Sequence, residues 1–289
     1  MSYGPFELVS YPCPLCGASE EEHVQQKTGV ASAQRFNIVR CSNCKLVRVN
    51  PRIANLRIAE LYDREYYAGR GFDRSVRYTG EIGGWARAEN DRIIRTVETA
   101  LKRPITGVRW IDVGCGTGAL LESVRSKGAV GLGSDDSDAA MEACRARNVP
   151  FLRANQLNEV LGTFDVVTAV EVIEHVTDPI QFLRFLVSLV RKGGIVYVHT
   201  ENWNVVRRFP GTPYIMPEGH LQYFTPTSMR KLFATVGLNE STVVDRCWFI
   251  LRRLPGPLQT ALPEWFVSQL RFVFQAAAAD FTPFPVGIR

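Results

Sequence analysis

The stretch Val108-Arg-Trp-Ile-Asp-Val-Gly-Cys-Gly-Thr-Gly118 decides the fold class of this chain. Its first half, Val108–Val113, is short and mostly apolar, which predicts a strand buried inside a parallel sheet. Three glycines then alternate with other residues, and helical spacing of apolar residues resumes over 119–127. A strand, a glycine-rich turn and a helix in this order predict the first unit of an α/β domain, with a ligand on the glycine loop.

The pattern repeats along the chain. Further strands are predicted at residues 129–133, 151–152, 164–170 and 195–199, and helices at 85–101, 139–147 and 179–190. Strands that alternate with helices predict a doubly wound, mostly parallel sheet with right-handed crossovers.

The glycine loop alone does not distinguish NAD enzymes from other nucleotide-binding proteins. With Asp112 on the strand, however, the pattern Asp-x-Gly-x-Gly-x-Gly resembles motif I of class I S-adenosylmethionine (SAM) dependent methyltransferases. The resemblance implies a Rossmann-like, seven-stranded sheet and a SAM site at Gly114, Gly116 and Gly118, where missing Cβ atoms let the cofactor approach the backbone. Asp112 is expected either to organise the loop or to contact the cofactor's ammonium through water.

Polar residues after the next two strands complete the predicted cofactor site. Asp135 is the expected acceptor for the ribose hydroxyls, since such a carboxylate stands about 20 residues after the loop in dinucleotide-binding folds. Asp136 is the alternative, unless it or Ser137 caps the following helix. By resemblance to the family, Asn155 and Gln156 are expected beside the adenine.

The segment Glu171-Val-Ile-Glu174-His175 follows the fourth strand and resembles that of the ubiquinone-biosynthesis O-methyltransferases. We assign Glu171 to cofactor binding, and Glu174 and His175 to catalysis, because ligands of open α/β sheets bind beyond the carboxyl ends of the strands. The alternative is that Glu174 and His175 only hold the loop together.

Residues 200–228 predict a lid rich in proline, glycine and aromatic residues. Its Gly219-His-Leu-Gln-Tyr-Phe-Thr-Pro226 resembles small-molecule and sugar methyltransferases that carry an N-terminal ribbon, as do Leu61-Tyr62 and Glu65-Tyr66-Tyr67. Residues 10–245 share this resemblance. A hydroxyl acceptor must lose a proton, so we predict His220, in a mobile loop, as the first choice of base and His175 as the second. Packing of the loop is the alternative role of His220.

Two Cys-x-x-Cys pairs stand near the N-terminus, Cys13/Cys16 and Cys41/Cys44. This spacing predicts a closed, tetrahedral Zn²⁺ ribbon with a structural role. The alternative, a redox Cys-x-x-Cys, needs no second copy of the motif. Gly17 predicts a knuckle turn with positive φ, residues 36–40 predict a strand, and Lys45 is expected to offset the charge of the zinc centre. The other cysteines, Cys115, Cys144 and Cys247, are expected to be free thiols.

The C-terminal segment predicts an amphipathic helix with Trp265, Phe266, Leu270, Val273 and Phe274 on one face. Packing on the core or a dimer contact is one expectation, and peripheral contact with the inner membrane surface is the other. The predicted domains are a zinc ribbon (1–50), a helical linker (51–105), a catalytic domain (106–245) and a C-terminal extension (246–289).

The composition is that of a soluble globular protein, with 46% hydrophobic and 22% charged residues in a chain of 289 and a net charge of +5. The N-terminus lacks a secretion signal, so a cytoplasmic monomer or homodimer is expected. The predicted function is methyl transfer from SAM to a hydroxyl of a small-molecule or glycan-type intermediate. C- or N-methylation, RNA modification and non-catalytic SAM binding are the alternatives, although the chain lacks a dense basic patch for nucleic acid.

Overall fold

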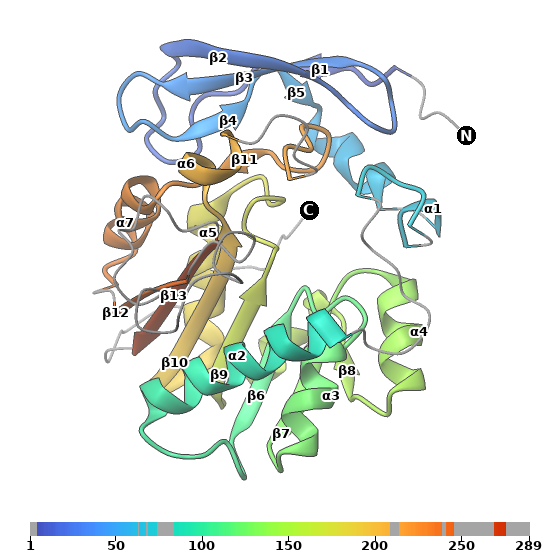
Figure 1. Cartoon of the computed structure of the whole chain (residues 1–289), viewed down its shortest axis with the longest axis vertical. Helices are drawn as coiled ribbons and strands as arrows, with labels where there is room; N and C mark the ends of the chain where they lie inside the picture. Colours follow the sequence, from blue (N-terminus) through green and yellow to red (C-terminus); the bar gives the residue numbers. More distant parts are fainter. Residues whose placement is uncertain are drawn as a thin grey trace.

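The computed structural model describes residues 5–62, 64–67, 69–73, 84–208, 214–238, 241–245 and 269–275. Its N-terminal part contains β1 (Leu8–Val9), β2 (Glu21–Thr28), β3 (Arg35–Cys41), β4 (Val47–Val49), β5 (Arg52–Ile53), η1 (Asn55–Leu61) and α1 (Arg64–Tyr67). We call residues 5–53 the cysteine ribbon. Figure 1 shows it above the catalytic sheet, on the side from which β10 (Val190–Glu201) leads into α6 (Trp203–Val206).

The catalytic domain follows the predicted alternation. Its first part contains α2 (Gly84–Leu101), β6 (Arg109–Val113), α3 (Ala119–Ser126), β7 (Val130–Ser134), α4 (Asp138–Ala146), β8 (Phe151–Leu152) and η2 (Ala154–Val160). Its second part contains β9 (Phe164–Val170), α5 (Pro179–Leu189), β10, α6, β11 (Gln222–Tyr223), α7 (Pro226–Thr235), β12 (Ser241–Asp245) and β13 (Gln269–Gln275). The predicted strands and helices of residues 85–199 are therefore confirmed to within a few residues.

Five parallel strands form the centre of the sheet, in the order β10-β9-β6-β7-β8. This arrangement confirms the doubly wound Rossmann-like fold. Beyond β10, β13 pairs antiparallel with β10, and β12 pairs antiparallel with β13. The predicted helical face is therefore wrong at Leu270, Val273 and Phe274, which lie in β13, because this part of the C-terminal extension completes the edge of the sheet.

Neighbouring strand residues point to opposite faces of the sheet, and each face packs against its own helices. Trp110 and Val166 join one apolar cluster with α2 and α3, while Ile111 and Val167 join another with α5 and α7. Cys13, Cys41 and Leu46 of the ribbon belong to this second cluster. The ribbon and the catalytic domain thus share one core. None of the described helices is long and apolar enough to cross a membrane.

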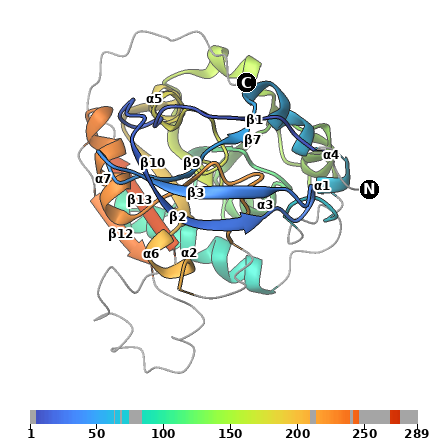
Figure 2. The same cartoon turned by 90° about the horizontal axis from the view of Figure 1, so that it is seen from above.

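The segment predicted as a lid is part of a second sheet. β11 pairs antiparallel with β4, so the order of this sheet is β11-β4-β3-β2 (Figure 1). Seen from above, β3 and β2 extend across the region over β9 and β10 (Figure 2). Residues 214–225, here called the β11 segment, are largely buried, and the mobility predicted for the loop around His220 stays a prediction. The segment is buried because the ribbon supplies the partner strand and an apolar cover.

Candidate functional site

The glycine loop after β6 requires its glycines. Gly114, Gly116 and Gly118 have φ of 74°, 50° and 72°, a region that residues with a Cβ rarely adopt. A Cβ on Gly114 would lie 2.5 Å from Cγ2 of Val172, and one on Gly118 would lie 2.8 Å from Sγ of Cys144. The backbone conformation and the packing against Val172 and Cys144 therefore require these glycines, and the approach of a cofactor to the loop stays a prediction.

Asp112 lies inside the sheet below this loop, with only 3% of its surface exposed. Its Oδ1 accepts a hydrogen bond of 2.6 Å from Thr168 Oγ1 of β9, and Thr168 Oγ1 in turn accepts one from Trp110 Nε1. Burial raises the pKa of Asp112 to about 7, although the Thr168 hydrogen bond opposes the shift. The carboxyl group thus joins β6 to β9, and both of its predicted roles at the cofactor stay predictions.

Asp135 follows the last residue of β7 and contacts the glycine loop directly. Its Oδ2 accepts a hydrogen bond of 3.1 Å from the Gly116 N–H, and its Oδ1 accepts one of 3.0 Å from the Ser137 N–H. Burial raises its pKa above the usual range. Ser137 caps α4 by accepting a hydrogen bond from the Ala140 N–H, while burial also raises the pKa of the neighbouring Asp136.

The predicted adenine contacts lie on η2. Asn155 and Gln156 are both exposed. The Oε1 of Gln156 accepts a hydrogen bond of 2.9 Å from the N–H of Arg153. This bond caps the N-terminus of η2, the helix that contains Gln156. The structure thus places both side chains at the β8 edge, on the surface, and their contact with adenine stays a prediction.

Three carboxyl groups meet where β9 and β10 end. Glu171 follows β9 with a φ of 54°, Glu201 ends β10, and Glu174 lies between them in space, so that their oxygens are within 4.8 Å of one another. Glu174 is 1% exposed, and its oxygens receive no hydrogen bond from a described nitrogen or hydroxyl. Burial and mutual repulsion raise the pKa values of Glu171 and Glu201 well above the usual range.

Histidines surround these carboxyl groups. His220 Nδ1 lies 3.5 Å from Glu201 Oε2, and His199 Nδ1 lies 3.5 Å from Glu171 Oε1. The rings of His175 and His220 meet edge to face at 4.6 Å between centroids. His220 is 2% exposed, and burial together with the nearby His175 lowers its pKa well below the usual range. Its imidazole is therefore neutral at neutral pH.

His175 is oriented through its Nδ1. This atom lies 3.0 Å from the Gly219 carbonyl oxygen and 3.0 Å from the Tyr62 hydroxyl. Because a carbonyl oxygen can only accept, Nδ1 carries the hydrogen and Nε2 of the neutral ring is left as an acceptor. The structure thus brings together the three predicted catalytic residues, Glu174, His175 and His220, whose ligand atoms also lie within 4.8 Å of one another.

The ribbon holds the β11 segment in place. The Leu221 N–H donates to the Glu174 carbonyl oxygen, and Gln222 Nε2 donates to two further carbonyl oxygens of the loop after β9. On the other side, the buried carboxylate of Glu218 accepts hydrogen bonds from the N–H groups of Val30, Ala31 and Ser32 in the β2–β3 turn. His220 is therefore fixed between the ribbon and the catalytic loop.

Glu218 and Tyr62 take part in this arrangement without having been predicted as site residues. From the sequence, Tyr62 stands out only as part of the linker motif, and Glu218 only as part of the predicted lid. The available signal was the Leu61-Tyr62 match itself, whereas nothing in the sequence pairs Glu218 with residues 30–32.

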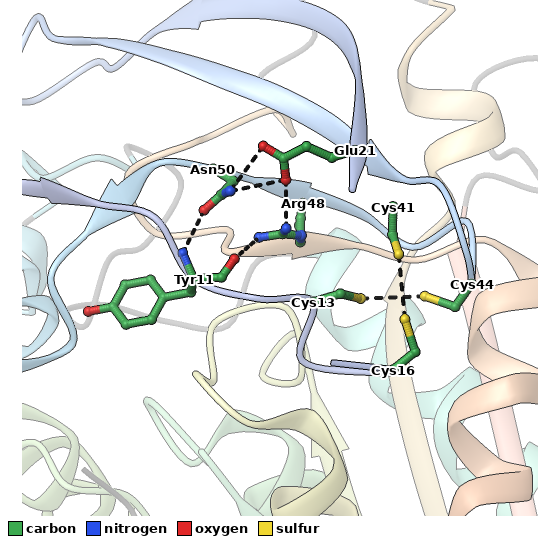
Figure 3. Close-up of polar contacts among 8 residues, drawn as sticks. All are labelled: Tyr11, Cys13, Cys16, Glu21, Cys41, Cys44, Arg48 and Asn50. Carbon is green, nitrogen blue, oxygen red and sulfur yellow. Dashed lines mark hydrogen bonds and ion pairs between the residues drawn. The ribbon is translucent and has the colours of Figure 1, made fainter. Parts of the chain in front are cut away.

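The four ribbon cysteines lie together. Their Sγ atoms are all within 4.8 Å of one another, with Cys13 and Cys44 at 3.4 Å and Cys16 and Cys41 at 3.5 Å (Figure 3). Four sulfurs each about 2.3 Å from one zinc ion stand roughly 3.8 Å apart, so the spacing fits a tetrahedral site. The thiols form no disulfide.

The two knuckle turns have positive φ, 74° at Gly17 and 68° at Lys45. The value at Gly17 confirms its prediction. The Lys45 ammonium lies 3.5 Å from Glu22 Oε1, so its charge has a partner other than the thiolates. Cys115 and Cys144 are free thiols, as predicted, whereas Cys247 lies outside the described residues, as do Trp265 and Phe266.

Comparison with known proteins now places the chain in a family. The profile of a family described as "Methyltransferase domain" matches residues 85–242. A ubiquinone biosynthesis O-methyltransferase of Ruegeria pomeroyi is 31% identical over 199 residues, which cover 63% of this chain and 76% of the relative. A protein of the same name from Rhizobium etli (strain CIAT 652) is 40% identical over 108 residues, but the match spans only 44% of its length and 35% of this chain.

Solved structures show the same fold. Magnesium protoporphyrin IX methyltransferase from Synechocystis PCC 6803, with bound S-adenosylhomocysteine (SAH), has a TM-score of 0.51 at 18% identity, covering 74% of this chain and 98% of that one. The chain belongs to the methyltransferase domain family and has a Rossmann-like fold.

Proposed function

We propose that the protein transfers a methyl group from SAM to a hydroxyl of a small-molecule or glycan-type biosynthetic intermediate. The observation that carries this proposal is the buried imidazole of His220, which lies between Glu201 and His175. A neutral imidazole can accept the proton that a hydroxyl must lose. The similarity to two proteins named as O-methyltransferases supports the same type of acceptor atom.

The cofactor half of the site comprises the glycine loop, Asp112 and Asp135. When bound, SAM supplies a methyl group on a sulfonium. The backbone of Gly114–Gly118 leaves room for the cofactor, and the Asp135 carboxylate is the acceptor suited to its ribose hydroxyls. The Glu171 carboxyl group lies at the adjacent end of β9, and a sulfonium bound beside it would favour its ionised form.

The acceptor half comprises Tyr62, Glu174, His175, Glu201 and His220. His220 accepts the proton of the acceptor hydroxyl, and the Glu201 carboxyl group, 3.5 Å from Nδ1, holds the ring in position. Tyr62 and the Gly219 carbonyl orient His175 as the second base. The β11 segment keeps water away from this region because its side chains are largely buried.

Zinc has a structural role in this proposal. Cys13, Cys16, Cys41 and Cys44 would hold the ion as a closed set of thiolates with no open position for substrate. Its function is to fix the ribbon, which in turn supplies β4 as the partner of β11.

The test is methyl transfer by the purified, zinc-loaded chain from labelled SAM to a panel of phenols, sugars, amines and a transfer RNA pool. His220→Asn is expected to lower kcat by about 100-fold or more while SAH affinity changes less than about twofold, because general-base catalysis typically contributes 10²–10⁴. The matched control is His23→Asn, at an exposed position of β2. Transfer to amines or RNA but to no hydroxyl, or a His220→Asn variant with the control's kcat, contradicts the proposal.

A further inference from the structure

A cleft of about 250 Å³ opens between the ribbon and the catalytic domain, and the proposed reaction does not use it. Tyr11, Arg48 and Arg52 line it from the ribbon, and Asp178 and Gln222 line it from the catalytic side. At roughly 30 Å³ per water molecule, it has room for a phosphate or carboxylate group and part of the molecule that carries it.

Arg48 is a buried cation with a counterion. Its Nη2 donates a hydrogen bond of 2.6 Å to Glu21 Oε2, and its Nη1 donates one of 2.8 Å to the Tyr11 carbonyl oxygen (Figure 3). Asn50 Nδ2 donates to both oxygens of Glu21 and thereby fixes the carboxylate. The charge of Arg48 is thus balanced within the ribbon.

Arg52 is buried to a similar degree, 7% exposed against 2% for Arg48, but none of the described carboxylates is its counterion. Its guanidinium lies 4.2 Å from the centre of the Tyr11 ring, and Nη1 makes one long hydrogen bond, 3.4 Å, to the Ile53 carbonyl oxygen. In the described part of the chain, no carboxylate forms an ion pair with it. Burial lowers its pKa to about 10, while Tyr11 opposes this shift and a smaller repulsion from Arg48 adds to it.

Asp178 does not fill this role. It is the carboxylate among the described residues that line the cleft, yet its Oδ1 already accepts hydrogen bonds from the N–H groups of Ile180 and Gln181 at the start of α5. It forms no ion pair with Arg52. A largely buried charge without a counterion is unfavourable, so an anion that enters the cleft meets a guanidinium that no described carboxylate neutralises.

We propose that this cleft binds a small anionic group, a phosphate or a carboxylate, through Arg52. A guanidinium presents two parallel N–H donors that match the oxygens of either group. The group belongs either to the methyl acceptor or to a separate anionic metabolite. The connection to the acceptor half is short, because Leu221 and Gln222, which line the cleft, follow directly after His220.

The experiment is a titration of the zinc-loaded full chain with inorganic phosphate, read by calorimetry and by the melting temperature, Tm, against sodium chloride of equal ionic strength. At about ten times its Kd, phosphate is expected to raise the Tm of the wild type by about 2–4 °C. Arg52→Met keeps the length of the side chain without its charge and is expected to abolish this rise. Arg52→Lys, which keeps the charge but not the paired donors, is expected to bind phosphate about tenfold more weakly.

Arg35→Met is the matched control, since it removes one arginine charge from an exposed position of the ribbon at the start of β3. A rise in Tm for Arg52→Met equal to that of the control, or no rise in the wild type, overturns the proposal. The readout requires no methyl transfer, so it stands apart from the proposed reaction.

A second arm separates the two sources of the anion. With an acceptor found in the methyl transfer panel, phosphate that raises the KM of that acceptor in the wild type, but not in Arg52→Met, assigns the anionic group to the acceptor. An unchanged KM alongside phosphate binding assigns it to a separate metabolite. Both results support the site.

Discussion

The cofactor half and the acceptor half of the site draw on different parts of the chain. Asp112–Gly118 and Asp135 come from two neighbouring strands and the turns that directly follow them. The acceptor half instead gathers Tyr62, Glu174, Glu201 and His220 from segments up to about 160 positions apart, and the ribbon holds the last of these in place. The cofactor half is thus a local motif, whereas the acceptor half is assembled by the tertiary fold. We therefore expect substitutions in one half to leave the function of the other half intact.

Loss of the metal is expected to have the largest effect, and only on the acceptor half. Cys41→Ser is expected to remove zinc, lower the Tm by more than about 10 °C and abolish methyl transfer, because a structural zinc supplies on the order of 10 kcal/mol. SAH affinity should change less than about threefold, because the described hydrogen bonds of the glycine loop run to Ser134, Asp135 and Arg147 of the catalytic domain. Metal analysis, calorimetry and a transfer assay measure the three effects, with Ser42→Ala as control. A metal-free chain with normal transfer contradicts the account.

Removing the Glu218 carboxylate, which joins the β11 segment to the ribbon, tests the acceptor half without changing the zinc site. Glu218→Ala leaves the N–H groups of Val30, Ala31 and Ser32 without their acceptor, which is expected to cost about 2–3 kcal/mol. We expect kcat to fall about tenfold or more with unchanged zinc content and SAH affinity. Glu20→Ala, at an exposed position of the ribbon, is the control. If SAH affinity falls and kcat does not, the two halves are not separate.

Asp135 tests the cofactor half. Asp135→Asn retains one oxygen for the Gly116 N–H but loses the charge, and we expect SAH to bind about tenfold more weakly, a cost of about 1.4 kcal/mol. The acceptor KM should not change. Glu142→Gln, exposed on α4, is the matched control for a lost carboxylate. Equal SAH affinities in the two variants would show that Asp135 does not serve the cofactor.

The smallest expected effect is a pH dependence from Asp112. Its pKa of about 7 in the folded chain lies above the unfolded value of roughly 3.9. Between these values the folded state holds a proton that the unfolded state releases, so the free energy of unfolding falls as pH rises toward 7. Asp112→Asn should flatten this fall and give a Tm a few degrees above that of the wild type near pH 8. Parallel curves for the two proteins in denaturation between about pH 5 and 8 would refute this.

The sequence predicted the sheet well, because the sheet depends on short-range patterns, and the glycine loop and Asp135 of the cofactor half lie together in the structure. The strand at residues 164–170 and the positive φ of Gly17 follow from local spacing and local backbone geometry. The motif residues of the cofactor half are also close in the chain. They lie together as soon as the two parallel strands β6 and β7 are neighbours.

The remainder depended on contacts that spacing does not encode. The neighbouring sequence gives no sign that residues 222–223 pair with β4. Without knowledge of that partner, the sequence of the β11 segment resembles that of a mobile loop. The spacing of the apolar residues at 270, 273 and 274 is compatible with a helix as well as with a strand. The pairing of this segment with β10 makes it a strand. The unpaired charge of Arg52 likewise follows only from the placement of Glu21 beside Arg48.

The central claim is that this chain is a SAM-dependent enzyme whose cofactor half works independently of the metal and the acceptor. Calorimetric titration of the zinc-loaded full chain with SAH tests it most directly. The account predicts one site per chain with a Kd in the micromolar range, within the usual span of enzyme–ligand affinities. An absence of binding at about 1 mM SAH, where even a −4 kcal/mol interaction is half saturated, would contradict it.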